Sequence, residues 1–199
     1  MIERNFEERT LTLNRNLLTI KSLIRRQNQD ALEKDIIITN LYEPCVENLT
    51  YLVYRVAHVL GVYLTIYDIV SVERLGSRRF EEASPLLLKP RPVAARLSTR
   101  RLAEEMVQRS RVLRNLNNEH LDLPGPRRRV VVHERLTRYF EHLYKELRST
   151  GRQQGYKYIW RKRGHLYVRR TDNHPAQEVR SWEEFHSMFP NSVDVESVD

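Results

Sequence analysis

Arginine and lysine are the residues of this 199-residue sequence whose type and spacing could do chemistry, and that chemistry is the binding of phosphate groups. Between Gly125 and Arg170 there are 14 Lys and Arg residues against 3 Glu and no Asp. From Asp172 to Asp199 the balance reverses, with 7 acidic residues against Arg180 alone. An excess of 11 positive charges within 46 residues is typical of a protein that binds a polyanion. The alternative is a solvated basic face that keeps the protein soluble.

Aromatic residues alternate with these cations in a predicted hairpin, whose strands are residues 156–161 and 165–169 and whose turn is 162–164. Alternation turns one set of side chains toward a core and the other toward solvent. Tyr158 and Trp160 are therefore either core side chains or platforms for base stacking, which contributes about 1–3 kcal/mol per base. We predict the core role. The basic side chains of the hairpin then form an exposed rim, namely Lys157, Arg161, Lys162, Arg163, Arg169 and Arg170.

Further arginines lie at the ends of predicted elements upstream. Arg74 ends a strand and Arg96 lies in the next one, while Arg100 and Arg101 begin a helix, where free backbone N–H groups favour anions. Taken singly, each is more typical of a surface salt bridge, but together they would line a groove. The predicted nucleic-acid-binding residues are Arg74, Arg96, Arg100, Arg101, Arg127, Arg128, Arg129, Lys157, Tyr158, Arg161, Lys162, Arg163, Tyr167, Arg169 and Arg170.

A heptad pattern at the N-terminus predicts one helix over Asn5–Glu33. Two series of apolar residues, seven apart within each series, form a seam that Gln27 weakens. We predict self-association as a dimer or trimer, and the alternative is an amphipathic helix packed on its own domain. The residues assigned to oligomerisation are Phe6, Leu13, Leu17, Ile20 and Ile24.

The middle of the chain predicts the order β-α-β-β-α-β of a ferredoxin-like sandwich, the fold of the RNA-recognition motif (RRM). Helix-capping residues precede both helices: Asn48, and Ser98 or Thr99. The predicted strands are 35–41, 69–72, 92–97 and 128–132, and the predicted helices are 48–60 and 99–115. The loop 77–89 contains an unusually apolar run, Leu86 to Leu88.

A smaller module follows, with an amphipathic helix over 134–149 that Thr150-Gly151 ends, the hairpin, and a helix over 182–188 that Ser181 caps. The fold class is therefore α+β. The predicted segments are an oligomerisation helix (1–34), an RRM-like domain (35–133), a basic helix-hairpin-helix module (134–190) and an acidic tail (191–199).

Catalysis has little support in the sequence. The histidines show no metal-binding spacing, and no phosphate-binding glycine loop or nucleophile elbow occurs. We therefore expect no enzyme activity and no cofactor or metal. No stretch approaches the roughly 20 apolar residues of a membrane span. Cys45 is the only cysteine and there is no apolar signal core, so we expect a cytoplasmic or nuclear protein, or one associated with a virion.

The ordered set of segments resembles a known family. The segments that carry the resemblance are Asp35–Leu41 with Pro44, Asn48–Gly61, Asp68–Gly76, Arg91-Pro92, Tyr156–Trp160, the Gly164 turn, Leu166–Arg170 and Ser181–Phe185. They resemble the nucleic-acid chaperone encoded by the first open reading frame of LINE retrotransposons. They resemble most closely the few-polyhedra (FP) family of baculoviruses and insect transposable elements, and the likeness covers roughly residues 5–190.

The resemblance implies a groove that follows the backbone of single-stranded RNA or DNA. The sequence departs from the usual RRM at Ile37 and at Ala94-Ala95, where base-stacking aromatics normally stand. We predict a non-enzymatic, weakly sequence-specific nucleic-acid chaperone of transposon or viral type. The alternative is an interaction protein of the baculovirus FP type that acts in virion or occlusion-body assembly, with viral structural proteins as partners.

Overall fold

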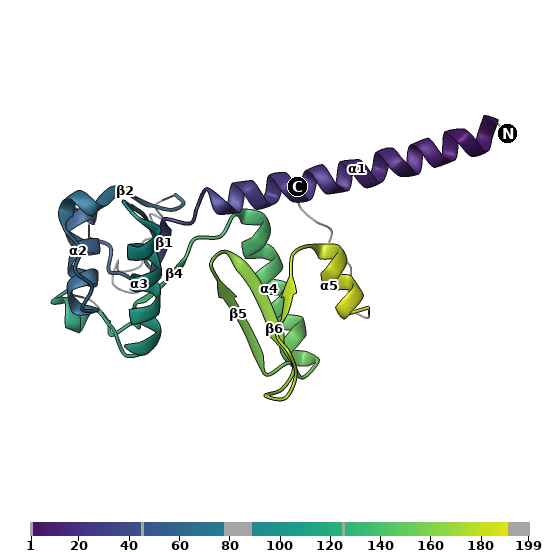
Figure 1. Cartoon of the computed structure of the whole chain (residues 1–199). Coiled ribbons are helices and arrows are strands. Elements are labelled where there is room, and N and C mark those ends of the chain that lie inside the picture. Colours follow the sequence, from purple (N-terminus) through teal and green to yellow (C-terminus); the bar gives the residue numbers. More distant parts are fainter. Residues whose placement is uncertain (1, 45, 78–88, 125, 191–199) are drawn as a thin grey trace. The chain divides into compact units, whose positions relative to one another are not determined.

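The computed structural model describes residues 2–44, 46–77, 89–124 and 126–190 and divides into two compact units (Figure 1). Unit 1 comprises Met1–Leu32 with Leu136–Asp199, and unit 2 comprises Glu33–Arg135. Unit 1 thus combines the N-terminal helix with the C-terminal module, although the sequence predicts them as separate segments. The predicted acidic tail, the Leu86–Leu88 run and Cys45 lie outside the described residues.

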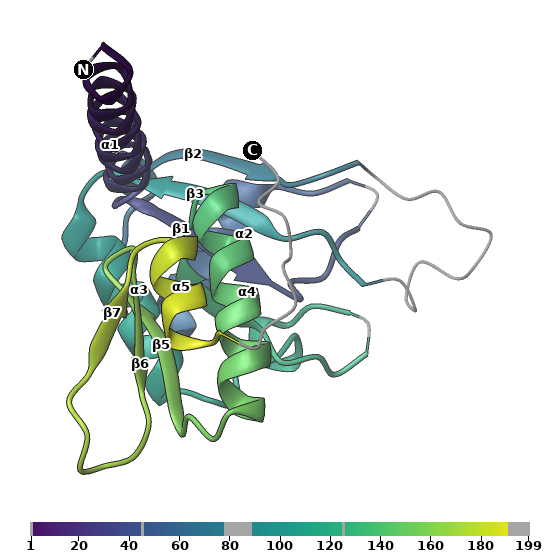
Figure 2. The same cartoon turned by 90° about the vertical axis from the view of Figure 1, so that its right-hand side faces the viewer.

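Unit 2 is an α+β sandwich in which two helices cover one face of a four-stranded sheet (Figure 2). The strand order is β2-β3-β1-β4 and every pair is antiparallel, which is the ferredoxin-like arrangement that the order of elements predicts. The strands are β1 (Asp35–Thr39), β2 (Ile69–Arg74), β3 (Val93–Leu97) and β4 (Val131–Glu134), and the main helices are α2 (Leu49–Val59) and α3 (Arg100–Val112). Two 3₁₀ turns, Ile66–Asp68 and Glu119–Leu121, complete it.

The core of unit 2 follows from alternation along the central strands. Ile36 and Ile38 are fully buried in the cluster that includes Val53 of α2 and Met106 of α3, whereas Ile37 lies on the opposite face, paired with Ala94. Both predicted caps are confirmed: Asn48 accepts a hydrogen bond from the backbone N–H of Tyr51, and Thr99 accepts one from that of Leu102. These caps fix the entry of each helix onto the sheet.

The last strand of unit 2 begins three residues later than predicted, at Val131 instead of Arg128. The backbone N–H of Val130 donates to Leu116, and Arg129 forms an isolated bridge with Asn117. The backbone of residues 129 and 130 therefore pairs with the segment after α3 and not with β1, and β4 begins only at Val131.

Unit 1 contains α1 (Ile2–Asp30), α4 (Arg138–Gln153), β5 (Tyr158–Lys162), β6 (His165–Arg169), β7 (Gln177–Val179) and α5 (Trp182–Met188). Its three strands form an antiparallel sheet in the order β5-β6-β7, of which the sequence predicted only the first two. The strand β7 is only three residues long, and its Gln-Glu-Val sequence carries no alternating apolar signal. The core of unit 1 consists of Leu136, Phe140, Leu143, Leu147, Leu166, Val168, Val179, Trp182, Phe185 and Phe189.

The helix α4 continues past Thr150-Gly151, so the predicted end is wrong. Gly151 lies buried inside the helix, where a Cβ atom would come within 2.6 Å of Cδ1 of Ile159 on β5. The glycine that follows the helix is Gly155, whose φ of +80° is the left-handed conformation typical of a helix end. Gly151 is therefore a close-approach residue and not a stop signal.

The C-terminal end of α1 is attached to the rest of unit 1. Gln29 is 3% exposed and its side chain accepts a hydrogen bond of 2.9 Å from the backbone N–H of Thr137, the N-cap of α4. The guanidinium of Arg25 lies 4.1 Å from the ring centre of Tyr139. The earlier part of α1 exposes its apolar side chains, including Leu17 (52%) and Ile24 (51%). Of the described helices, none is long and apolar enough to span a membrane.

Candidate binding surface

The three-stranded sheet of unit 1 has a core face and an outer face, and strand register decides which side chains lie on each. Ile159, Leu166 and Val168 point to the helices α4 and α5. Tyr158 and Trp160 alternate with Ile159 and so lie on the outer face. The predicted core role of these two aromatics is therefore wrong, because the aliphatic residues of the hairpin fill the core.

Cross-strand pairs build a row of aromatic and basic side chains on this outer face. The register pairs Tyr158 with Arg169 and Trp160 with Tyr167, and it pairs Lys162 with His165 next to the turn. The rings of Trp160 and Tyr167 are stacked, with centroids 5.5 Å apart and planes inclined by 19°. Both side chains are half-buried. We call the side chains of Tyr158, Trp160, Lys162, His165, Tyr167 and Arg169 the outer-face row.

The turn of the hairpin explains the register. Arg163 and Gly164 both have positive φ angles, 56° and 75°, so the turn consists of these two residues and belongs to the tight class that suits antiparallel strands. A two-residue turn sets the pairs at 162 with 165 and at 160 with 167. The sequence prediction, with a three-residue turn, missed this register and with it the role of Trp160 and His165.

One end of the row carries a compact polar cluster. The carboxylate of Asp172, which follows β6, accepts hydrogen bonds of 2.5 Å from Lys157 Nζ and from the Tyr158 hydroxyl. The guanidinium of Arg169 lies 4.5 Å from the centre of the Tyr158 ring and 3.9 Å from Asp172. The hydrogen bonds from Lys157 and Tyr158 lower the pKa of Asp172, and the same contacts raise the pKa of Lys157.

The other end of the row contacts α1. His165 forms an ion-pair contact with Glu178 of β7, and Nη1 of Arg26 approaches Nδ1 of His165 at 2.9 Å and Glu178 at 3.6 Å. Burial raises the pKa of Glu178, but hydrogen bonds from His165 and Arg180 outweigh it and lower the pKa overall. This end is therefore closed by internal contacts.

Not all of the predicted basic rim faces outward. Arg161 turns to the helix side, where it is 3.1 Å from Glu141 and 5.1 Å from the ring centre of Tyr144 on α4. Its side chain is 11% exposed, so it stabilises the module and is not part of an open rim. Lys157, Lys162, Arg163 and Arg170 are exposed.

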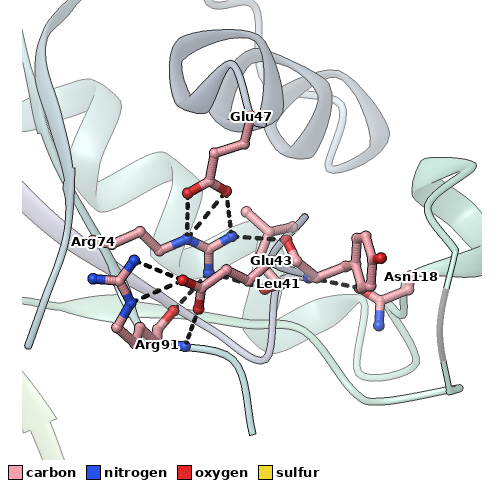
Figure 3. Close-up of polar contacts among 7 residues, drawn as sticks. Leu41, Glu43, Glu47, Arg74, Arg91 and Asn118 are labelled. Atoms are coloured by element: carbon pink, nitrogen blue, oxygen red, sulfur yellow. Dashed lines mark hydrogen bonds and ion pairs between the residues drawn. The ribbon is translucent and has the colours of Figure 1, made fainter. Parts of the chain in front are cut away.

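Arg74, at the end of β2, is a buried structural residue and not a free cation (Figure 3). Its side chain is 3% exposed and donates to both carboxylate oxygens of Glu47, with a closest distance of 2.8 Å. It also donates to the backbone carbonyls of Leu41, Tyr42 and Arg91. This network uses the guanidinium donors of Arg74 within unit 2, which weighs against its predicted role in binding nucleic acid.

Arg91 adds a second ion pair beside the first. Its guanidinium donates to Glu43 at 2.6 Å (Figure 3). It also donates to the backbone carbonyl of Gly76. Burial raises the pKa of Glu43, but the hydrogen bonds from Arg91 and the charges of Arg74 and Arg91 prevail and lower it. The two ion pairs join the connection between β1 and α2 to the last residue of β2 and to the segment just before β3.

The other predicted arginines of unit 2 lie nearer to solvent, and several have acidic neighbours. Arg96 donates to buried Asp35 at 2.6 Å, and Arg100 contacts Glu104 at 2.8 Å and Glu33 at 3.0 Å. Arg101 and Arg127 are well exposed and have looser pairs, at 3.8 Å with Glu105 and 3.5 Å with Glu119; Arg128 is half-buried and Arg129 exposed. The predicted residues thus divide between the two units.

Unit 2 is a ferredoxin-like α+β domain, and unit 1 is a small α+β module with a basic and aromatic sheet face and a long helix. In the module, residues 137–188 match the family model of the baculovirus FP protein domain 2. The match runs from the N-cap of α4 to the last residue of α5, about a quarter of the chain. No curated protein matches the chain.

Proposed function

We propose that this chain is a non-enzymatic interaction protein of the baculovirus FP type, which acts in virion or occlusion-body assembly as several copies joined through α1. The observation that carries the proposal is the apolar seam of α1, which is half or more exposed from Leu11 to Ile24. The C-terminal end of the same helix is fixed to the module that matches the FP domain 2. A second copy of α1 would bury the seam as a short coiled coil.

The test is a pair of variants with the same change in net charge. Leu17→Asp with Ile24→Asp places two charges in the seam, and we expect it to yield monomers in light scattering because buried carboxylates oppose helix association. Arg15→Asp makes an equal change at an exposed position between the seam residues, and we expect it to keep the wild-type mass. Equal masses for the two variants would count against α1 as the contact.

A second candidate function is the binding of single-stranded nucleic acid by the outer-face row. The stacked pair Trp160–Tyr167 favours it, because half-buried aromatics beside exposed lysines and arginines are what unpaired bases and phosphates require. The ion pairs of Arg74 and Arg161 weigh against the wider arginine groove that the sequence suggested.

Binding of fluorescent single-stranded RNA and DNA over a salt series tests this candidate. We expect the affinity to fall steeply with salt and to fall a further 5- to 150-fold, about 1–3 kcal/mol, in Trp160→Ala. Tyr63→Ala, at an exposed aromatic of unit 2, is the control and should bind as the wild type does. Micromolar or weaker binding with a flat salt dependence would reject the candidate.

A further inference from the structure

The polar cluster at the end of the outer-face row holds one carboxylate among three donors. Asp172 accepts from Lys157 Nζ and from the Tyr158 hydroxyl through separate oxygens, and it lies 3.9 Å from Arg169. Lys157 Nζ also lies 5.1 Å from the centre of the Tyr158 ring, so Lys157 and Arg169 both lie close to this aromatic ring. Tyr158 is the first residue of β5 and Arg169 the last of β6, while Lys157 precedes β5 and Asp172 lies in the connection to β7.

The charges of this cluster do not balance. Lys157 and Arg169 face a single carboxylate, that of Asp172, so these three side chains carry a net charge of +1. In the described part of the chain, the buried Nε of Arg169 has no hydrogen-bond acceptor. An ammonium, a guanidinium and a hydroxyl directed at one acidic group are the donors that bind a phosphate oxygen in other proteins. The Asp172 carboxylate therefore occupies the position that the phosphate of a bound ligand would take.

We infer that Lys157, Tyr158 and Arg169 form a phosphodiester subsite for single-stranded nucleic acid, and that Asp172 is its internal competitor. The bound nucleic acid displaces the Asp172 carboxylate, and one of its phosphates contacts the three donors. The neighbouring base then lies next to Trp160 and Tyr167. The inference rests on the second candidate function, the binding of single-stranded nucleic acid, and adds that the Asp172 carboxylate regulates this binding.

The competitor is weak enough to be displaced. Asp172 and Lys157 are both more than half exposed, and ion pairs between exposed side chains contribute little to the stability of a protein. Asp172 lies outside the strands, in the turn after β6, so its side chain can move without breaking the sheet. A phosphodiester also gains from the release of counterions, which an internal carboxylate does not.

The experiment compares Asp172→Asn with Asp122→Asn in fluorescence anisotropy with 20-nucleotide single-stranded RNA and DNA over a salt series. Asp122 is also exposed and paired with an arginine, Arg55, and its φ of 49° suits asparagine, so the control makes the same charge change in unit 2. We expect Asp172→Asn to bind about 3- to 10-fold more tightly than Asp122→Asn, with a steeper salt dependence because one more phosphate is neutralised. Adding Lys157→Gln to Asp172→Asn should abolish the gain.

Circular dichroism verifies folding, and Asp172→Ser repeats the test if the asparagine variant does not fold. If the Asp172 and Asp122 variants bind with equal affinity and the wild type binds in a salt-dependent way, Asp172 is not a competitor of the phosphate. The proposal that the protein binds nucleic acid would then still stand. Failure of the wild type and of every variant to bind would reject both. A gain that survives Lys157→Gln would also overturn the subsite.

Discussion

Arg74 shows how a single residue can look like a ligand-binding group in sequence and be a structural one in the fold. It donates to the Glu47 carboxylate and to three backbone carbonyls while almost fully buried. We predict that Arg74→Met lowers the free energy of unfolding by about 3–5 kcal/mol, because the change leaves a carboxylate buried without its partner. Urea denaturation measures the difference.

Arg101→Met is the control for this prediction. The Arg101 side chain is 83% exposed and its ion pair is loose, so its replacement should change the free energy of unfolding by no more than about 0.5 kcal/mol. Similar values for the two variants would show that the Arg74–Glu47 pair does not stabilise unit 2.

Glu43 gives unit 2 a dependence on pH. Its pKa is lower in the folded state than its ordinary value of 4.5, so its contribution to stability is full above that value and is lost as the pH falls through the lowered folded pKa. We predict that Glu43→Gln destabilises the protein at pH 7 and that the difference from the wild type narrows below about pH 4. Urea midpoints measured between pH 7 and pH 3 test this, and a difference that grows in acid would contradict it.

At the scale of elements, Gly151 sets how closely α4 approaches β5. Alanine favours a helix over glycine by roughly 1 kcal/mol, but its Cβ would meet Cδ1 of Ile159 at 2.6 Å. We therefore predict that Gly151→Ala is better tolerated in an Ile159→Val background, which lacks Cδ1, than in the wild type. A double-mutant cycle of thermal unfolding measures the coupling. Zero coupling would mean that the helix and the strand move apart freely.

The sequence predicted most elements, because their signals are local. The caps Asn48, Thr99 and Ser181 and the β-branched run from Ile36 to Ile38 locate helices and a strand from a few neighbouring residues. The end of α4 and the strand β7 were missed, because both depend on contacts with β5 or β6 from elsewhere in the chain.

The candidate site was predicted less well than the fold, for a physical reason. Residue type shows that an arginine can bind phosphate, but not whether a carboxylate distant in sequence already occupies it. Glu47 is 27 residues from Arg74, and Glu141 is 20 residues from Arg161. By contrast, the pairing of Trp160 with Tyr167 could have been found from a two-residue turn at Arg163-Gly164.

At the scale of the whole molecule, a net charge of +8 overstates how much positive surface is available to a partner. Several arginines that contribute to it are held in ion pairs within each unit. The described part of unit 1 also presents two features that are not charged, the exposed apolar seam of α1 and the half-buried, stacked aromatics of the outer-face row. Both features favour a protein that acts by association.

Sedimentation velocity of the wild-type chain over a range of concentrations tests the central claim, that α1 joins several copies, most directly. We predict a mass that is two or three times 23.9 kDa and that falls toward one copy on dilution, because the seam is short. A mass of one copy up to about 100 µM, well above the dissociation constant expected of a specific complex, would contradict the claim.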